Sequence, residues 1–403
     1  MAKTHESLRA IATSRAVGIH FRADLCRVVD AANVGVCTLR QAIRHARCAV
    51  GPISSRHLRI TSLLLCIAAI GCAVPERASE SPSGEYLLCF WNTENFFDNR
   101  VNGWRNEPDK DFDRWFGEDR AVFEQKIKNL TEVLAALNDG RGPDILALAE
   151  VEVESKAADA LAASLNEAIQ KETPPYRHIL MKNPRGGRNI ATAILTRLPV
   201  VADRTQLLGN RHRILEGHIV VDGKDLTVLA THWTSRVSDK AGEGREKYAK
   251  QIYGRFRAMH KANADVSLLV CGDFNDNPDD PSVKEYLHAS GDLDRVKAND
   301  DPPLLCDLFA KRWAEKKDIG THYYRGRPFV FDHLVVSPAM LNGKGGWLCL
   351  PETAKIVEHR FVVPRGRNKG HPLAFGNERE NVPLSKRGVS DHLPVTVRLR
   401  VNK

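Results

Sequence analysis

Residues 267–275 read Ser-Leu-Leu-Val-Cys-Gly-Asp-Phe-Asn, so a short apolar run ends in the carboxylate of Asp273 and the amide of Asn275. Near the other end of the chain, residues 390–392 read Ser-Asp-His. Further amides and carboxylates lie upstream at Asn92, Glu94 and Glu150. These are the groups that metal-assisted phosphodiester hydrolysis requires. The residue types therefore favour an enzyme.

Several other segments form short, continuous apolar runs, which are typical of strands buried on both faces. With the first run they cover residues 86–91, 144–150, 190–196, 226–232, 267–272 and 329–336. Between them, apolar side chains spaced three or four residues apart predict amphipathic helices. These cover residues 123–137, with Gly140 as a stop, 161–169 and 248–259. Strands that alternate with outer helices predict a layered α/β domain.

Polar side chains stand at the ends of these runs. The groups include Asn92, Glu94, Glu150, His232, Asp273, Asn275, Asp391 and His392. Strand ends of a layered sheet can meet at one rim, where loops display side chains. Any one of these residues alone reads as a surface group or a helix cap, but packing does not explain all of them. We therefore predict one shared site.

Six motifs stand in a fixed order along the chain. They are WNTEN (91–95), DILALAEVE (144–152), THWTSR (231–236), GDFND (272–276), FDHLVVS (331–337) and SDHLPV (390–395). Together they resemble the endonuclease/exonuclease/phosphatase superfamily, which includes pancreatic deoxyribonuclease, neutral sphingomyelinases and inositol polyphosphate 5-phosphatases. The resemblance covers residues 85–400. It implies a four-layer α/β/β/α sandwich, in which two mixed β-sheets pack face to face with helices outside.

The resemblance also implies a metal site. Glu150 is expected to ligate Mg²⁺ or Mn²⁺, since carboxylate and amide oxygens suit hard cations. Asn92 and Glu94, two residues apart on a strand end, are expected beside it, and Asp391 is expected to hold a second metal or support the first. Ala149 stands where the family usually has Gln, which removes a supporting amide and leaves the ligand in place.

The same resemblance assigns the remaining catalytic roles. His392 is expected to act as the general base that deprotonates water, and Asp332 to orient its imidazole. Asp273 and Asn275 are expected to position the nucleophile and the phosphoryl oxygens. His232 is expected to donate a hydrogen bond to the phosphate or to help protonate the leaving group.

The substrate is predicted from a loop before Asp332. Residues 321–326 include Tyr324 and Arg325, a pair that can stack on bases and contact phosphate, although the loop could instead pack on its own tyrosines. We favour an exported, metal-dependent endonuclease that acts on DNA or RNA. The alternatives are a sphingomyelinase-like lipid phosphodiesterase or a phosphate-ester phosphatase, and a surface binding module without turnover.

Charge does not decide between these alternatives. The chain carries a net charge of +9, but residues 1–72 hold ten Lys or Arg and three Asp or Glu, whereas the remainder holds 49 and 47. The basic character is therefore mostly a property of the leader, and net charge predicts no polyanion-binding surface. Basic runs at residues 182–188 and 360–369 are expected to be solvated loops.

The front of the chain reads as an export segment. Residues 61–72 form a short apolar run that follows Arg56 and Arg59 and ends in small residues before Cys72. This resembles a lipoprotein signal with Cys72 as the lipidated residue and membrane anchor; a plain secretory signal and a buried helix are the alternatives. Residues 1–50 are interpreted as a non-native or disordered extension, or as a transit peptide, 51–72 as the export segment, 73–84 as a linker and 85–403 as the catalytic domain.

The cysteines divide in the same way. Five of the nine lie at or before Cys72, which leaves Cys89, Cys271, Cys306 and Cys349 in the catalytic domain. No metal-ligand spacing joins these four. Cys89 and Cys271 fall inside apolar runs and are expected to be small buried hydrophobes, while the sequence leaves disulfide pairing open.

Overall fold

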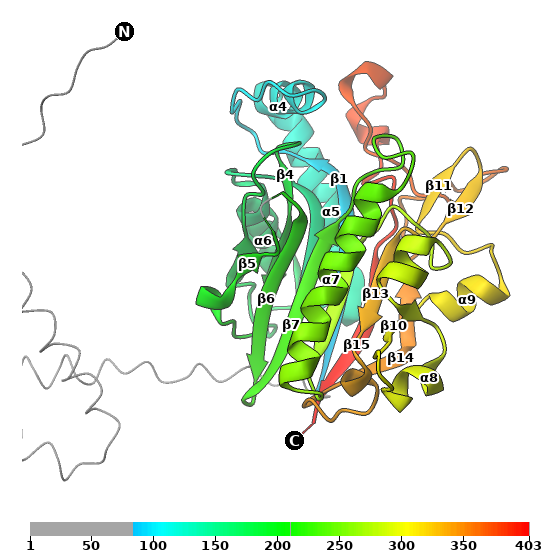
Figure 1. Ribbon diagram of the computed structural model, residues 1–403. Helices are drawn as coiled ribbons and strands as arrows, with labels where there is room; N and C mark the ends of the chain where they lie inside the picture. Colours follow the sequence, from blue (N-terminus) through cyan, green and yellow to red (C-terminus); the bar gives the residue numbers. More distant parts are fainter. Residues whose placement is uncertain (1–83, 210, 403) are drawn as a thin grey trace, which may run out of the picture. The chain divides into compact units, whose positions relative to one another are not determined.

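The computed structural model describes residues 84–209 and 211–402 (Figure 1). The interpretations of residues 1–83, including the export segment and lipidation at Cys72, lie outside these residues. Within the described part, no helix is both long and apolar enough to cross a membrane. All four cysteines there are free and buried, so the domain holds no disulfide among them.

The first sheet is mixed and has the strand order β14-β15-β1-β2-β4-β3. β1 pairs in parallel with β2, and the other neighbours pair antiparallel. The strands are β1 (Glu85–Phe96), β2 (Ile145–Glu152), β3 (His178–Met181), β4 (Ile190–Thr196), β14 (Trp347–Ile356) and β15 (Val395–Val401). β14 and β15 were not among the predicted strands.

The second sheet is also mixed, with the order β5-β6-β7-β8-β13-β10-β9. Its strands are β5 (Gln206–Leu207), β6 (Arg213–Val221), β7 (Lys224–His232), β8 (Leu268–Asp273), β9 (Ala289–Ser290), β10 (Leu305–Asp307) and β13 (Asp332–Val336). A separate hairpin consists of β11 (His322–Tyr324) and β12 (Arg327–Phe329). The predicted strand at 329–336 is thus wrong in its bounds, because Phe329 pairs with His322 in the hairpin while Asp332 pairs with Asp273 in the sheet.

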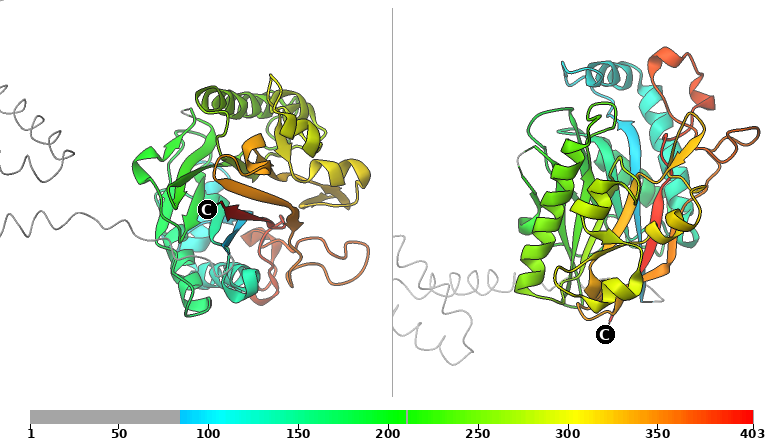
Figure 2. Two further views of the ribbon diagram at one scale, coloured as in Figure 1. Left: turned by 90° about the horizontal axis from the view of Figure 1, so that it is seen from below. Right: turned by 45° about the vertical axis from the view of Figure 1, so that its right-hand side comes forward.

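The helices are α4 (Asp109–Glu118), α5 (Arg120–Gly140), α6 (Ala157–Ala168), α7 (Glu243–Ala262), α8 (Leu293–Ala298) and α9 (Ala310–Glu315). α5 and α6 cover the outer face of the first sheet, and α7 covers that of the second (Figures 1 and 2). Single turns stand at η2 (Ala202–Arg204), η3 (Ser282–Tyr286), η4 (Pro338–Leu341), η5 (Glu378–Glu380) and η6 (Leu384–Lys386). The regular part of α5 ends earlier than Gly140, since Asn138 and Asp139 already have φ of 54° and 58°.

Three apolar layers hold the sandwich together. Alternation along β1 sends Leu88 and Phe90 into the layer between the sheets and Cys89 and Trp91 into the layer under α5 and α6. A third layer joins α7 to the outer face of the second sheet. The predicted four-layer α/β/β/α sandwich, similar to deoxyribonuclease I, is therefore confirmed.

Candidate active site

Strand ends bring the predicted residues to one rim, at the top in Figure 1. β1 and β2 run parallel, as do β7 and β8, so both pairs of carboxyl ends reach the same edges, and antiparallel β13 begins where β8 ends. These ends carry Asn92 and Glu94 (β1), Glu150 (β2), His232 (β7), Asp273 (β8) and Asp332 (β13). Asp391 and His392 lie in the loop before β15, and Asn275 follows β8.

Irregular backbone at two strand ends sets the directions of the acidic side chains. The pairing of β1 with β2 shifts register between Asn92 and Phe96, and that of β2 with β4 shifts between Leu148 and Val151. Within these irregularities, Glu94 and Glu150 have φ of 51° and 61°. Such bulges re-aim side chains and are common beside active sites.

Asn92 links two carboxylates. Its Nδ2 donates to Asp273 Oδ2 at 2.9 Å and to Glu150 Oε1 at 3.3 Å. Its Oδ1 accepts from the backbone N–H of Glu94 at 3.0 Å. A single buried amide therefore fixes the relative positions of an acid from each sheet.

His392 and Asp332 form a close pair. His392 Nδ1 lies 2.7 Å from Asp332 Oδ2, and His392 Nε2 lies 3.7 Å from Asp273 Oδ2. His392 Nδ1 is thus bonded to Asp332, and its Nε2 faces Asp273. Burial lowers the pKa of His392, but the carboxylates of Asp332, Asp273 and Asp391 outweigh that effect and hold the pKa well above its ordinary value.

The loop that carries His392 is tied to β1. Ser390 Oγ donates to the carbonyl of Asn92 at 2.7 Å and accepts from the His392 N–H at 3.0 Å. Trp91 Nε1 donates to the His392 carbonyl at 2.9 Å. These bonds fix the loop that holds the imidazole beside Asp273.

Asn275 holds the turn that follows β8. Its backbone N–H donates to Asp273 Oδ1 at 2.8 Å, and its Nδ2 donates to the Trp233 carbonyl at 3.3 Å. Burial raises the pKa of Asp273 to about 7. The turn thus positions the carboxyl group of Asp273, whose negative charge is destabilised by burial.

Glu150 and His232 face each other across the centre. Glu150 Oε2 accepts from the Asn95 N–H at 2.9 Å, and Glu150 Oε1 lies 3.7 Å from His232 Nε2. Burial raises the pKa of Glu150, but nearby positive charge, including that of Arg188, and the Asn95 N–H outweigh burial and hold the pKa below its ordinary value. Burial lowers the pKa of His232 to about 4, which leaves a neutral imidazole near pH 7.

Glu94 lies in a different set of contacts from the one expected. Its carboxylate accepts from the backbone N–H groups of Phe375 and Gly376 at 2.7 and 3.0 Å, instead of bonding beside Glu150. Burial and the nearby charge of Asp391 raise the pKa of Glu94 to about 8. Metal ligation by Glu94 and Asp391 stays a prediction.

Lys126 is a site residue that the sequence analysis missed. It is fully buried on α5, and its Nζ donates to the carbonyls of Glu94 and Val389 at 3.0 and 2.7 Å. Burial lowers its pKa to about 8, against the raising effect of Glu94 and Asp391. A charged residue on the apolar stripe of the predicted helix was the available signal.

Arg188 is the second residue that was missed, because the basic run at 182–188 was interpreted as a solvated loop. Its guanidinium bonds to the buried Asp109 carboxylate at 2.6–2.7 Å and to Asn95 Oδ1 at 2.5 Å. Its Nη1 lies 4.0 Å from Glu150 Oε2. For Arg188 the interpretation was wrong, because α4 supplies an acid that holds the guanidinium against the centre.

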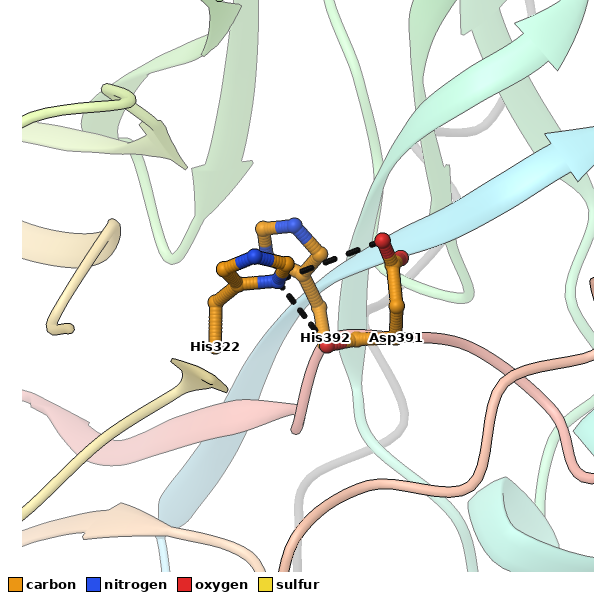
Figure 3. A group of neighbouring side chains, drawn as sticks. All are labelled: His322, Asp391 and His392. Atoms are coloured by element: carbon orange, nitrogen blue, oxygen red, sulfur yellow. Dashed lines mark hydrogen bonds and ion pairs between the residues drawn. The ribbon is translucent and has the colours of Figure 1, made fainter. Parts of the chain in front are cut away.

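The β11–β12 hairpin reaches the site through His322 (Figure 3). The His322 ring lies 4.6 Å from the His392 ring, and its Nδ1 lies 3.1 Å from the Asp391 carbonyl. Tyr324 and Arg325 stand at the hairpin tip, where Tyr324 is 58% exposed and the Arg325 guanidinium lies 5.2 Å from its ring. The predicted substrate-binding pair is thus available to solvent beside the site.

The donor set fits a divalent cation. Two groups offer ligand atoms within 4.8 Å of one another: Asp273, Asp332 and His392, and His322, Asp391 and His392. Asp332 Oδ1 is buried and has no hydrogen-bond partner in the described part of the chain. The carboxylate oxygens of Asp273, Asp332 and Asp391 suit Mg²⁺ or Mn²⁺ better than soft metals.

Comparison with protein families defines the class of protein. The model described as the endonuclease/exonuclease/phosphatase family matches residues 87–401. This chain therefore belongs to the endonuclease/exonuclease/phosphatase family, whose members are hydrolases that act on phosphate esters and generally use divalent metal ions.

Several solved structures are similar to the chain. Truncated TDP2 from Caenorhabditis elegans is 16% identical with a TM-score of 0.46, covering 79% of this chain and 98% of that one. The human nocturnin catalytic domain is 15% identical with a TM-score of 0.45, covering 79% and 95%. A mannosyl-6-phosphatase from Bacteroides thetaiotaomicron is 16% identical with a TM-score of 0.45, covering 78% and 99%. No curated protein matches the chain.

Proposed function

We propose that this protein is a divalent-metal-dependent phosphodiesterase, and specifically an exported endonuclease that cleaves DNA or RNA. The observation that carries the proposal is the His392–Asp332 pair, joined at 2.7 Å, with His392 Nε2 facing the linked carboxylates of Asp273 and Glu150. Metal-assisted hydrolysis needs a general base and, facing it, a group of carboxylates that can bind a metal ion.

Each group has a role that follows from its contacts. His392 Nε2 takes the proton of the attacking water, while Asp332 holds the imidazole and stabilises its charged form. The water oxygen bonds to phosphorus as the opposite P–O bond breaks. Asp273 orients the water, and Asn275 contributes a further polar group beside it.

The opposite side of the centre binds the phosphate. Neutral His232 donates a hydrogen bond to a phosphoryl oxygen, and Arg188 lies close enough to Glu150 to add positive charge there. Glu150 and Asn92 would hold Mg²⁺ or Mn²⁺. When bound there, the cation supplies positive charge that polarises the phosphoryl oxygens and lowers the pKa of His392 toward a value at which it accepts a proton.

The test is hydrolysis by the full chain with Mg²⁺ or Mn²⁺ and with EDTA. Plasmid DNA, RNA and sphingomyelin are assayed in parallel, beside Glu150→Ala. Metal-dependent cleavage of nucleic acid that is lost in the variant supports the proposal. Cleavage of sphingomyelin alone would replace it with the lipid phosphodiesterase, and equal activity in EDTA would contradict the metal requirement.

We also propose export with a lipid anchor at Cys72, based on the apolar run and small residues of 61–72. Cys72→Ser is expected to move the protein from the membrane fraction to the soluble fraction of the cells that express it. An unchanged distribution would contradict the anchor.

A further inference from the structure

We propose that a basic cavity beside the active centre binds a second phosphate of the substrate, so that the substrate is a polynucleotide strand. The inference rests on the proposed endonuclease function and assigns it a second phosphate-binding site. The cavity has a volume of about 570 Å³ and is lined by three segments: residues 185–187, residues 211–213, and the loop and helix at Thr234, Gly244 and Tyr248.

Positive charge in this cavity is not neutralised. Arg185, Arg211 and Arg213 line it, no acid does, and none of the three forms an ion pair within the described part of the chain. Other arginines of the same rim are paired with acids, as Arg188 is with Asp109 at 2.6 Å and Arg245 is with Asp276 at 2.8 Å. Unpaired guanidinium groups around a cavity suit a phosphate, which they can contact with two parallel hydrogen bonds.

The wall of the cavity is held open and in place. Arg213 Nε donates to the Ile190 carbonyl at 2.9 Å, so its side chain is positioned without losing its charge. Gly187, with φ of +79°, passes so close that an added Cβ would lie 3.2 Å from Arg213 Nη2. At Gly244 an added Cβ would lie 2.9 Å from Asp239 Oδ2 and 3.1 Å from Thr234 Oγ1. Side chains at these two positions would therefore crowd Arg213 and Thr234, which line the cavity.

The cavity adjoins the reacting centre. Arg213 on β6 pairs in register with His232 on β7, and Thr234 follows two residues later. The cavity loop continues directly into Arg188, whose Nη1 lies 4.0 Å from Glu150. A phosphate in the cavity would thus be a near neighbour of the phosphate that is cleaved.

A second contact region lies on the other side of the centre. The β11–β12 hairpin stands beside His392, and β6 stands across the rim from it (Figure 1). The hairpin tip exposes Tyr324 next to Arg325, which suits a base and its phosphate. A ligand that contacts both the cavity and the hairpin must pass over Glu150 and His392. An extended nucleic acid strand is long enough to do so, and a small monoester is not.

The same charges disfavour the lipid alternative. The head group of sphingomyelin carries a quaternary ammonium beside its single phosphate, and that cation would face Arg185, Arg211 and Arg213. A monophosphate has no second anion to fill the cavity. Repeated phosphates along a strand match both the charge and the position.

The experiment compares the full chain with Arg185→Gln/Arg211→Gln. The matched control is Lys261→Gln/Lys344→Gln, which removes the same charge from exposed side chains at the opposite end of α7 and beyond β13. Binding of a fluorescein-labelled single-stranded oligonucleotide is measured by anisotropy in EDTA over a salt series. Hydrolysis of bis(p-nitrophenyl) phosphate, which has one phosphate, is measured with Mn²⁺.

The cavity variant is expected to bind the oligonucleotide on the order of tenfold more weakly, with a salt slope reduced by about 0.7 for each lost phosphate contact. Its hydrolysis of bis(p-nitrophenyl) phosphate and the behaviour of the control are expected to match wild type. If wild type binds and cleaves nucleic acid but the cavity variant is unchanged, the inference is wrong and the nuclease proposal stands. If wild type hydrolyses only the small diester, the nuclease proposal and the inference both fall.

Discussion

Two clusters of buried acids have opposite pKa shifts. One lies within the second sheet, and the other lies at the active-site rim. Glu216 on β6 accepts from Arg255 at 2.6 and 2.7 Å and lies 3.0 Å from His218 Nε2. Despite burial, these hydrogen bonds lower the pKa of Glu216 to about 2. At the active-site rim, burial instead raises the pKa of Asp273 to about 7 and that of Glu94 to about 8.

The two clusters differ in whether each buried acid has a positively charged partner. Glu216 has a guanidinium and an imidazole within hydrogen-bond distance, so its charge is matched inside the protein. The rim gathers five carboxylates against the side chains of Lys126, Arg188 and His392; they belong to Glu94, Glu150, Asp273, Asp332 and Asp391. Buried acids without matching cations are costly, and they persist where a function needs them. The excess of carboxylates at the rim therefore fits a site for a divalent cation.

The largest expected effect separates the two buried histidines. His392→Ala is expected to lower kcat for bis(p-nitrophenyl) phosphate by about 10²–10⁴-fold, the range for loss of a general base. His218→Ala, in the neutralised cluster, is expected to lower thermal stability and to leave kcat near the wild-type value. Equal kcat losses in the two folded variants would contradict the assignment of the base.

Breaking the neutralised cluster is expected to have a large effect on stability. Glu216→Gln removes the negative charge that faces Arg255 and His218, and a loss of about 3 kcal/mol in the free energy of unfolding is expected from charge-assisted hydrogen bonds. Urea unfolding measures it. Glu246→Gln, on the same helix as Arg255 but in a partly exposed pair with Lys250, is the control and should change stability by less than about 0.5 kcal/mol.

Removing the buried ammonium group of Lys126 is expected to have a smaller effect on the free energy of unfolding. Lys126→Met leaves the carbonyls of Glu94 and Val389 without their donor, but it also removes the cost of burying an ammonium group. We expect a loss of about 2 kcal/mol in urea unfolding, and Lys128→Met, exposed on the same helix, should change little. If Lys126→Met were as stable as wild type, the hydrogen bonds of Lys126 would contribute nothing to the stability of the fold.

The sequence predicted the layers of the fold more fully than the charges at the rim. Continuous apolar runs identify β1, β2, β4, β7 and β8 because these strands are buried on both faces. β6, β14 and β15 were not predicted, since polar residues interrupt their apolar runs. His392 and Asp332 are 60 residues apart in the sequence and 2.7 Å apart in the structure, and their catalytic roles stay predictions.

The rest of the site depends on tertiary structure. Glu94 was expected beside Glu150 on the basis of the family resemblance. The irregular backbone at Glu94 instead turns the side chain to Phe375 and Gly376. Arg188 acquired its role only through Asp109, an acid 79 residues away on α4. No pattern in the neighbouring sequence predicts either contact.

The smallest expected effect is a pH dependence specific to Glu216. Its pKa is about 2 in the folded protein, against an ordinary value of 4.5. Its contribution to stability is therefore complete above pH 4.5 and is lost as the pH falls toward about 2. The difference in melting temperature between wild type and Glu216→Gln should shrink over that window, and a constant difference would contradict the charge argument.

The most direct test of the central claim is calorimetric titration of Mn²⁺ into the wild-type chain, Glu150→Gln and Glu216→Gln. The rim account predicts binding to wild type and to Glu216→Gln with similar affinity, and binding to Glu150→Gln that is weaker by at least about tenfold, as expected when a charged ligand is neutralised. Absence of binding to wild type, or equal affinity in Glu150→Gln, would contradict the claim that the unmatched carboxylates of the rim form a cation site.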